Sequence, residues 1–347
     1  MGVVIDERLF GLIRDFLTVY LPKQKSCSEN TVKAYKEALN LLFGYVKSVT
    51  DLSLAEITFE TITSQTILEF LDWLENSRGC SVSTRNHRLS CIRSFYKYAG
   101  NMDMTVTTYI SGVQKVPIKK LPSSQPVKYF SEDALKIILD QPDTNTLNGI
   151  RNLFYMILLY DTGARNQEIL DLKVSDIHAL GKNSYVLVTG KGRKTRIVPI
   201  MQKTVEHFNR YVNLFCDGKI TDDPLFYVIR KGVKQKMSDD NVSKFIKAYG
   251  TNARAVSSLV PENLHPHMFR HARAIHLYRG GMPLALISEW LGHAQLETTL
   301  IYAYADTKMK REAIDRATSK SNPLISSDVK PMWQDNESMI KRLYGLI

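Results

Sequence analysis

The sequence predicts a mainly α-helical protein with a small β-sheet, in which an all-α domain is followed by an α+β domain. Apolar residues recur at helical spacing through about the first hundred residues, and a Pro- and Lys-rich break follows at about residues 101–128. Two short β-branched runs appear only after that break. At 347 residues the chain is also longer than a single hydrophobic core usually supports, which favours two domains.

The first domain is predicted to span residues 1–108 and to contain only helices. Apolar residues recur every three or four positions from the start of the chain, and Ser28 is placed to cap the next helix. Runs with the same period predict further helices at residues 66–74 and 83–98. No strand-like alternation interrupts this pattern.

The helix predicted at residues 83–98 is unusually basic. Its cations, which alternate with apolar residues, include Arg85, Arg88, Arg93 and Lys97. Such a helix could lie along a DNA groove, but a solvated charged face on a core helix is an equally good explanation. These four side chains are therefore candidate DNA contacts with a structural alternative.

Residues 109–128 are interpreted as an interdomain linker. The segment VPIKKLPSSQPVK concentrates Pro, Ser and Lys, which interrupt helical periodicity and favour an extended chain. Its lysines could also contact DNA phosphates, although exposed linkers are often basic without such a role.

The second domain is predicted to span residues 129–320 and to mix helices with a hairpin. Ser131 caps a first helix, and a strongly apolar helix follows at residues 147–160. The runs 185–189 and 195–200 are β-branched and flank the sequence GKGRK, which predicts a β-hairpin. Helices are then predicted at residues 201–215, 238–248, 267–279, 283–291 and 297–305.

Composition limits the classes of partner. The chain has 46 Lys and Arg against 35 Asp and Glu, for a formal net charge of +11 and a pI near 9.3. This balance favours a polyanion, either nucleic acid or an anionic membrane surface, or it marks a merely basic soluble protein. Because no stretch approaches the roughly 18 apolar residues of a membrane span, we expect no membrane association and a cytoplasmic protein.

The cysteines and histidines give little support for a metal site. The 4 cysteines are scattered without C-x-x-C pairs, so neither a zinc site nor a disulfide framework is indicated. His267 and His271 have the i, i+4 spacing of paired metal ligands, but Met268 stands where a zinc protease motif requires Glu. We expect no metal and interpret His271 as a structural residue.

Four short patterns contain residues that could carry chemistry, although each alone is weak. They are TGARNQEI at residues 162–169, GKGRK at 190–194, HPHMFRH at 265–271 and LGHAQLETTLIYAY at 291–304. Taken singly, Arg165 would be a helix-start residue paired with Glu168, and Lys191 a turn lysine. Tyr302 and Tyr304 would be ordinary core aromatics.

Taken together, the patterns resemble the catalytic set of the tyrosine recombinase (phage integrase) family. H-x-x-R, L-G-H and a tyrosine nine residues after that last His occur in the family's order, and TGAR with Glu168 resembles its first Arg box. The resemblance implies the catalytic set Arg165, Lys191, His267, Arg270, His293 and Tyr302, with Glu168 in support. Tyr304 falls outside the spacing.

The resemblance also covers the first domain and implies the function. SENTVKAYKEAL and STRNHRLSCIRSFYKY resemble the helical, SAM-like core-binding domain of XerC- and XerD-type members, so the likeness extends from about residue 8 to 315. It implies a site-specific recombinase or integrase of mobile DNA that cleaves and rejoins strands through a 3′-phosphotyrosyl intermediate. Neither metal nor ATP is implied.

Each member of the set has an expected role. Arg165 and Arg270 would stabilise charge on the phosphate, because a guanidinium fork matches two phosphate oxygens. By the resemblance, His267 would accept the proton of Tyr302 and His293 would donate to the phosphate. Lys191 would protonate the leaving 5′ oxygen, while Glu168 orients Arg165.

Residues 321–347 are interpreted as a tail that ends in a helix. After the connector SNPLISSDVKP, the residues Ile340, Leu343, Tyr344 and Ile347 share one helical face. This stripe could pack on its own domain, but members of the family dock a terminal helix into a neighbouring protomer. We therefore expect homodimers on one DNA site and homotetramers on paired sites.

Three other functions are compatible with parts of the pattern. A type IB topoisomerase would share the chemistry but relax supercoils without exchanging partners. A non-catalytic DNA-binding protein could keep the fold, although the complete catalytic set argues against it. A metal-dependent nuclease would use the His cluster and lose activity with a chelator.

Overall fold

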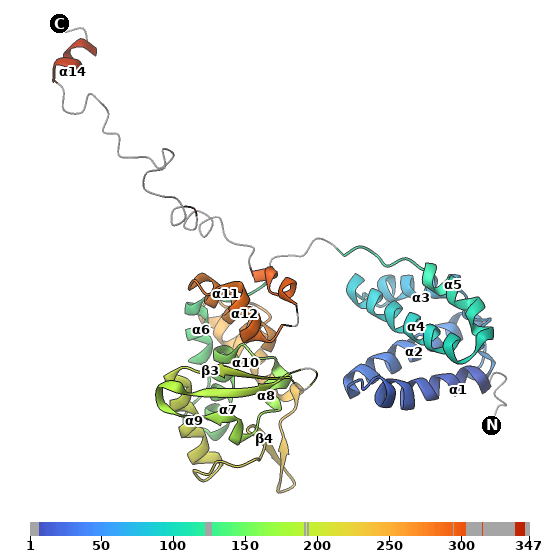
Figure 1. Ribbon diagram of the computed structural model, residues 1–347, viewed down its shortest axis with the longest axis horizontal. Coiled ribbons are helices and arrows are strands. Elements are labelled where there is room, and N and C mark those ends of the chain that lie inside the picture. The colour runs from blue at the N-terminus through green and yellow to red at the C-terminus, as the bar shows by residue number, and fades with distance from the viewer. Residues whose placement is uncertain are drawn as a thin grey trace. The chain divides into compact units, whose positions relative to one another are not determined.

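The computed structural model describes residues 7–121, 127–190, 192, 194–293, 295–302, 314 and 337–343. It divides into two units, whose boundary lies between Gln125 and Pro126 (Figure 1). Each unit contains a hydrophobic core of its own. The prediction of a mainly α-helical protein with a small β-sheet is confirmed, and the described residues contain a second, two-stranded sheet besides.

The first unit is all helical in its described part. Ser28, Thr63 and Ser81 cap three of its helices, each accepting a backbone N–H three residues on. The elements are α1 (Glu7–Asp15), the π-helix η1 (Phe16–Gln24), α2 (Glu29–Thr50), η2 (Leu54–Glu56), α3 (Ser64–Asn76), α4 (Val82–Met102), η3 (Met104–Val106) and α5 (Thr107–Lys115).

Helix α4 forms the centre of this unit, because it packs against α2, α3 and α5. Its apolar face includes Phe95 and Tyr96, each only 1% exposed. Phe95 meets Phe16 edge-on at a centroid distance of 5.5 Å and lies parallel to Phe59. Burial of these rings on one face of α4 explains the helical spacing of its apolar residues in the sequence.

The arginines of α4 are mostly engaged inside the unit, which corrects part of the DNA-contact prediction. Arg85 is 1% exposed and donates to the Pro117 carbonyl at 2.7 Å. Arg93 donates to carbonyls of the segment 113–116, and Arg88 to the Ala34 carbonyl at 3.1 Å. Lys97 is exposed. Arg85 in particular is buried too deeply to reach a phosphate in this conformation.

The segment after residue 108 also differs from the linker predicted at 109–128. Helix α5 continues to Lys115, and Val113 and Val116 are buried in the first core. Arg85 and Arg93 of α4 donate to carbonyls in the last turn of α5 and directly after it, so this part of the chain packs as structure rather than as a connector. The Pro- and Lys-rich composition marks only the portion beyond it.

The second unit contains helices around a three-stranded sheet and a separate hairpin. Its elements before the second hairpin are α6 (Glu132–Leu139), α7 (Leu147–Thr162), α8 (Asn166–Leu170), η4 (Val174–Asp176), β1 (Ile177–His178), η5 (Gly181–Asn183), β2 (Tyr185–Thr189), β3 (Thr195–Pro199) and α9 (Gln202–Phe215). Those that follow are β4 (Tyr227–Arg230), β5 (Val233–Lys236), α10 (Asp239–Val256), α11 (Pro266–Arg279), α12 (Leu284–Leu291), η7 (Leu296–Thr298), η8 (Leu300–Tyr302) and α14 (Glu337–Leu343).

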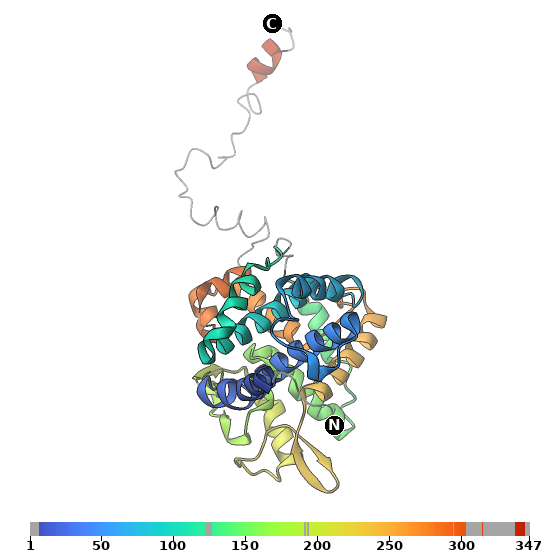
Figure 2. The same ribbon diagram turned by 90° about the vertical axis from the view of Figure 1, so that its right-hand side faces the viewer.

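The predicted hairpin is present as β2 and β3, which pair antiparallel, with β1 on the other side of β2. Val186, Val188 and Val198 are fully buried on one face of this sheet. The hairpin β4–β5 was not predicted. Every residue of β5 is exposed, and the hairpin projects from the unit (Figure 2), so it lacks the buried face that makes a strand recognisable in sequence.

Helix α7 forms the core of the second unit. Phe154, Tyr155 and Leu158 are fully buried on it, and it packs against both α9 and α11. The helix therefore fixes the position of α11 relative to the turn that follows Thr162. Both of these segments contain residues of the candidate site.

The prediction of an α-helix at residues 297–305 is wrong for the residues that the structure describes. Residues 296–302 form the two 3₁₀ turns η7 and η8, between which Thr299 is fully buried. The β-branched side chains of this segment favour a regular α-helix less than unbranched ones. Tyr304 and the tail residues Tyr344 and Ile347 lie outside the described residues.

Among the described residues, no helix is both long and apolar enough to cross a lipid bilayer.

Candidate active site

The turn between α7 and α8 positions Arg165. Gly163 ends α7 in the left-handed conformation, with φ of 59°, and an added Cβ there would meet Leu291 Cδ2 at 3.0 Å. Arg165 then occupies the N-cap position of α8, where its backbone N–H donates to the Glu168 carboxylate at 2.9 Å, and its side chain is 41% exposed. A glycine at 163 therefore lets the chain turn closely beneath α12 and present Arg165 at the surface of the site.

Glu168 holds Arg165 as predicted, and it also holds a second arginine. Its carboxylate is buried and accepts from Arg165 Nη1 at 2.8 Å and from Arg196 Nη2 at 2.8 Å. Burial by itself would raise the pKa of Glu168, but these hydrogen bonds outweigh it and lower the pKa overall. Glu168 is therefore an anion shared by two cations.

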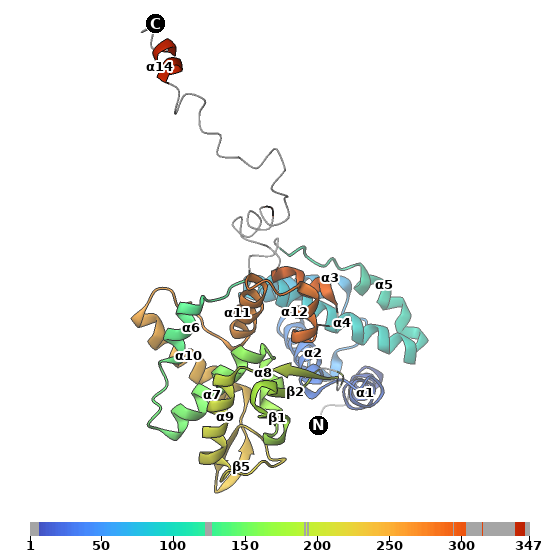
Figure 3. The ribbon, with the colours of Figure 1, turned by 60° about the vertical axis from the view of Figure 1, so that its left-hand side comes forward.

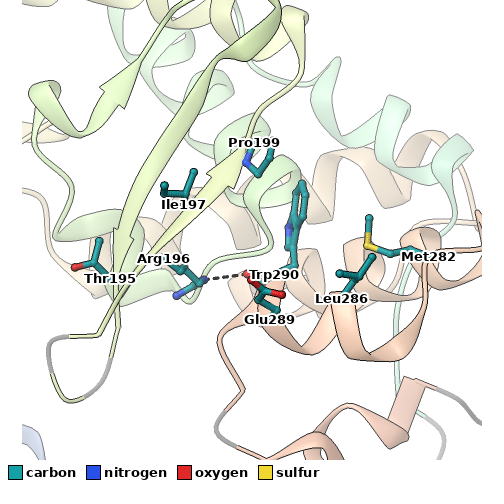
Figure 4. Close-up of a pocket in the computed structure, with 8 residues that line it drawn as sticks. All are labelled: Thr195, Arg196, Ile197, Pro199, Met282, Leu286, Glu289 and Trp290. Atoms are coloured by element: carbon teal, nitrogen blue, oxygen red, sulfur yellow. Dashed lines mark hydrogen bonds between the residues drawn. The ribbon is translucent and has the colours of Figure 1, made fainter.

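Arg196 connects the sheet to α12. It lies on β3, and its Nε donates to the Trp290 carbonyl at 2.9 Å (Figure 4). Close beside it, Gly292 adopts φ of 65°, and an added Cβ there would meet Arg196 Nη1 at 3.0 Å. The hairpin that bears Lys191 is thus tied through Arg196 to the end of α12. Lys191 itself lies outside the described residues.

Helix α11 contributes Arg270 from a buried position. Pro266 occupies its first turn, where the missing N–H has no cost, and α11 and α12 lie side by side (Figure 3). Arg270 is 1% exposed and donates to the Gly163 carbonyl at 2.8 Å and to the Leu291 carbonyl at 2.9 Å. It joins the two turns that contain Arg165 and His293.

The segment after α12 brings His293 and Tyr302 to the same place. His293 Nδ1 lies 2.7 Å from the hydroxyl of the buried Thr299, and its ring lies parallel to that of Tyr302 at a centroid distance of 6.4 Å. Tyr302 is 4% exposed, and its backbone N–H donates to the Thr299 carbonyl at 3.0 Å. Thr299 therefore fixes both residues.

The Tyr302 hydroxyl lies 2.9 Å from Nδ1 of His271, which sequence analysis had set aside as structural. His267, the residue expected to accept the proton, lies one helical turn earlier, with its ring 4.5 Å from that of His271 and nearly perpendicular to it. His267 is exposed, whereas His271 is partly buried. The contact between His271 and Tyr302 could be found only from the path of the chain after α12.

Positive charge dominates the site. Burial, followed by the nearby Arg165, lowers the pKa of Arg270 to about 10. Burial and the arginines lower the pKa of His293 to about 4. Burial raises the pKa of Tyr302, while Arg270 and Arg165 act in the opposite direction. Clustered guanidinium groups, two of which share the carboxylate of Glu168, favour the approach of an anion.

A buried ion pair supports the site from behind. Arg273, one turn after Arg270, pairs with Asp161 at 3.0 Å and lies over the ring of Trp290. Asp161 also accepts from the Thr204 hydroxyl at 2.6 Å. Sequence analysis missed this pair and Arg196, because residues brought together from distant segments leave no local signal. Within the described ranges, no group of three or more His, Cys, Asp or Glu side chains is placed to hold a metal ion.

Comparison with known families agrees with this geometry. Residues 128–309 match the model of the phage integrase family, and residues 13–101 match that of the phage integrase N-terminal SAM-like domain. This chain belongs to the phage integrase family. Its second unit contains the matched catalytic region, and its first unit the matched SAM-like domain. The resemblance inferred from the short motifs is thereby confirmed.

Two curated relatives that this phage integrase family member resembles are named tyrosine recombinases. It is 31% identical over 292 residues to tyrosine recombinase XerA of Pyrococcus horikoshii, covering 84% of this chain and 88% of the relative. It is also 31% identical over 321 residues to tyrosine recombinase XerC of Thermodesulfovibrio yellowstonii, covering 91% and 97%. The chain is therefore an enzyme of site-specific DNA recombination, a tyrosine recombinase.

Solved structures share the fold at lower identity. XerH site-specific recombinase bound to palindromic difH substrate matches with a TM-score of 0.64 at 20% identity, covering 90% of this chain and 89% of that one. A lambda integrase dimer bound to a COC′ core site matches with a TM-score of 0.59 at 16% identity, covering 83% and 96%. These likenesses concern the fold alone.

Proposed function

We propose that this recombinase cleaves and rejoins duplex DNA with Tyr302 as the nucleophile, through a 3′-phosphotyrosyl intermediate and without metal or ATP. The observation that carries the proposal is the position of the Tyr302 hydroxyl. It is buried beside neutral imidazoles and within a cluster of guanidinium groups that share one carboxylate. A nucleophile, proton acceptors and a receptor for phosphate charge thus occupy one site.

The arginines suit the transition state of this reaction. Attack on a phosphodiester places additional negative charge on the non-bridging oxygens, so fixed cations directed at those oxygens lower the barrier. Arg165 has an exposed side chain oriented by Glu168, while Arg270 lies deeper. We propose that the two receive the phosphate together and that His293 donates a hydrogen bond to one of its oxygens. The family resemblance assigns acceptance of the Tyr302 proton to His267.

The reaction conserves the energy of the broken bond. The phenol oxygen of Tyr302 forms a bond to phosphorus as the bond from phosphorus to the 5′ oxygen breaks, so one phosphodiester replaces another. Rejoining reverses the exchange when a 5′ hydroxyl attacks the phosphotyrosyl bond. We propose Lys191 as the acid that protonates the departing 5′ oxygen, following the family resemblance.

The partner that we propose is double-stranded DNA with paired recombination sites. The net charge of +11 favours such a polyanion. We propose a homodimer on each site and a homotetramer in the synaptic complex, with the tail helix exchanged between protomers, and action on mobile DNA at the nucleoid in the cytoplasm. Of that tail the structure describes α14, Glu337–Leu343.

A covalent-trapping experiment tests the proposal. Nicked suicide duplexes carrying inverted-repeat sites from the DNA around the gene should yield a protein–DNA adduct that maps by peptide sequencing to Tyr302. Tyr302→Phe should lower adduct formation to background, a loss of at least about 10⁴-fold, because no other group replaces a missing nucleophile. DNA binding in a gel-shift assay should remain.

The matched control is Tyr304→Phe, which removes the neighbouring candidate hydroxyl and should still form the adduct. Persistence of the adduct in Tyr302→Phe, or its loss in Tyr304→Phe alone, would refute the assignment. Adduct formation should also persist in a chelator. Relaxation of supercoiled plasmid without any recombinant product would instead favour a topoisomerase.

A further inference from the structure

The hydrogen bond between Tyr302 and His271 points to His271 as the acceptor of the Tyr302 proton. The family resemblance implies His267 for that role. Nδ1 of His271 lies 2.9 Å from the phenol oxygen, which is the usual length for a hydroxyl-to-imidazole hydrogen bond. The ring centroids of the two residues lie 5.7 Å apart, so the contact is made through the edge of the imidazole rather than by stacking. This edge presents a nitrogen directly to the attacking oxygen.

The other two histidines of the site are placed differently. His293 Nδ1 is already engaged by the hydroxyl of Thr299 at 2.7 Å, and its ring lies parallel to that of Tyr302. His267 is exposed, with the ring of His271 next to its own at 4.5 Å. These positions suit contact with an incoming phosphate, whereas the partly buried His271 faces the tyrosine.

His271 is neutral near pH 7. Burial first, and then the neighbouring His267 and Arg270, lower its pKa to about 4. A neutral imidazole has one nitrogen that lacks a hydrogen, and a protonated phenol always has one hydrogen to donate. We therefore assign Nδ1 as the acceptor and place the ring hydrogen of His271 on Nε2.

We propose that His271 is a catalytic residue of this recombinase and the acceptor of the Tyr302 proton, an inference that rests on the proposed role of Tyr302 as nucleophile. In cleavage, the O–H bond of Tyr302 breaks and its proton passes to Nδ1 of His271, while the phenol oxygen bonds to phosphorus. The 5′ oxygen departs with the electron pair of its bond and takes a proton from the general acid. In rejoining, Nδ1 returns its proton to the phenol oxygen.

The ionisable groups around His271 are histidines and arginines, together with Tyr302. His267 and Arg270 lie on α11, His265 lies at its N-cap, and His293 follows α12. Tyr302 contacts His271 directly. Three further groups act on Arg270: Arg165, Glu168 and Arg196. A phosphate received by Arg165 and Arg270 adds negative charge to this set, which favours the protonated form of His271. The imidazole thus becomes more basic when the substrate arrives.

Single-turnover cleavage of nicked suicide DNA at different pH values tests the role of His271. His271→Ala and His271→Asn should each slow adduct formation about 10²–10⁴-fold at pH 7, the usual contribution of a general base. Asn keeps an acceptor near the position of Nδ1 but cannot take a proton, so it separates proton transfer from hydrogen bonding.

The pH dependence separates a catalytic role from a structural one. Without a base, the reaction depends on the fraction of Tyr302 already ionised, and burial raises the pKa of that phenol above 10. The rate of both His271 variants should therefore rise about tenfold per pH unit between pH 7 and 9, relative to the wild-type rate. A wild-type rate in His271→Asn, or a slow rate without the steep pH dependence, overturns the proposal.

His267→Ala is the matched control, because it removes the adjacent imidazole from the same helix. Its cleavage should be slower through loss of a phosphate contact but should keep the wild-type pH dependence. A steep dependence in His267→Ala with a flat one in His271→Ala would assign the base to His267 and overturn the inference.

The hydrogen bond can also be tested without DNA. In ¹⁵N-histidine spectra of the full chain, the His271 signals should show a bare Nδ1 and a protonated Nε2, and Tyr302→Phe should shift the Nδ1 signal. Absence of that shift overturns the inference whatever the cleavage result. A wild-type adduct that does not map to Tyr302 would refute the proposed function instead, so the two failures are distinguishable.

Discussion

The basic helices α4 and α11 look alike in sequence and differ in what surrounds their arginines. Arg85 on α4 and Arg270 on α11 are both 1% exposed, and both donate to backbone carbonyls of neighbouring segments. A buried arginine bound to carbonyls is therefore common to both units. Burial and hydrogen bonding alone do not distinguish a site from a scaffold.

The neighbouring charges make the distinction. Arg85 lies 3.9 Å from the carboxylate of Glu75, and Lys119, which shares Glu75, also pairs with Asp72, so two cations are matched there by two carboxylates. Arg270 has Arg165 and Arg196 as neighbours, and the one carboxylate among them, Glu168, is already bonded to both of these. An imbalance of positive charge that the fold maintains is a better sign of an anion site than a basic stretch of sequence.

The largest effect that would sharpen this comparison is expected from Arg270→Lys. Lysine keeps the positive charge but loses the planar fork, so it cannot hold both carbonyls and direct a second edge at a phosphate. We expect adduct formation per bound DNA to fall about 10²–10³-fold, as for the loss of one preorganised donor in other active sites. Single-turnover trapping on suicide DNA measures it.

Arg273→Lys is the control for Arg270→Lys. It changes an arginine one turn further along α11 that should not act directly on the reaction. Arg273 is bonded to Asp161 and lies behind the site, so its replacement should lower stability more than the rate of the remaining folded protein. If Arg273→Lys slowed cleavage as much as Arg270→Lys at equal folded fraction, the distinction between the two arginines would fail.

In the first unit we expect a smaller effect, on stability, from Arg85→Met. Methionine fills much of the space but leaves the Pro117 carbonyl without its donor, which costs about 1–3 kcal/mol. Glu75 keeps Lys119 as an ion-pair partner. Hydrogen exchange should therefore quicken in α5 and the segment after it, while α11 serves as an internal reference.

Cleavage per bound DNA should be unchanged in Arg85→Met, since the residue does not face solvent. A selective loss of cleavage with normal protection of α5 would mean that α4 belongs to the site after all, and the comparison between the two helices would no longer hold.

Most helices could be predicted from the sequence because their signals are local. Ser28 caps α2 as expected, and the runs around GKGRK are the strands β2 and β3. Tyr302 could be singled out from Tyr304 by its distance from His293 along the chain. Such spacing is preserved in the fold because one short segment, fixed by Thr299, contains both residues.

The missed features depend on contacts between distant segments. Arg196 is an ordinary strand residue until β3 lies beside α12, and only then does it share Glu168 with Arg165. His271 appeared to be a packing residue because its partner is 31 positions away. Likewise, α5 could not be separated from a linker, because its last turn is stabilised by hydrogen bonds that Arg93 of α4 donates to the Val113 and Gln114 carbonyls. Charge pairing across the fold, rather than periodicity, determines these features.

The smallest expected effect, and the one that bears most directly on α4, comes from Lys97→Ala. Of the four predicted DNA contacts of α4, Lys97 is the one that is exposed, whereas the three arginines are buried or partly buried. If it neutralises one phosphate, its removal should weaken binding a few-fold and reduce the slope of log affinity against log salt by about 0.9. Lys47→Ala, which removes an equal charge from the exposed end of α2, is the control. An unchanged slope would mean that α4 has no phosphate contact through Lys97. The basic residues of α4 would then be explained by the carbonyls and carboxylates that its arginines bind. Of the two helices, α11 alone would then be associated with a DNA site, through the unbalanced positive charge around Arg270.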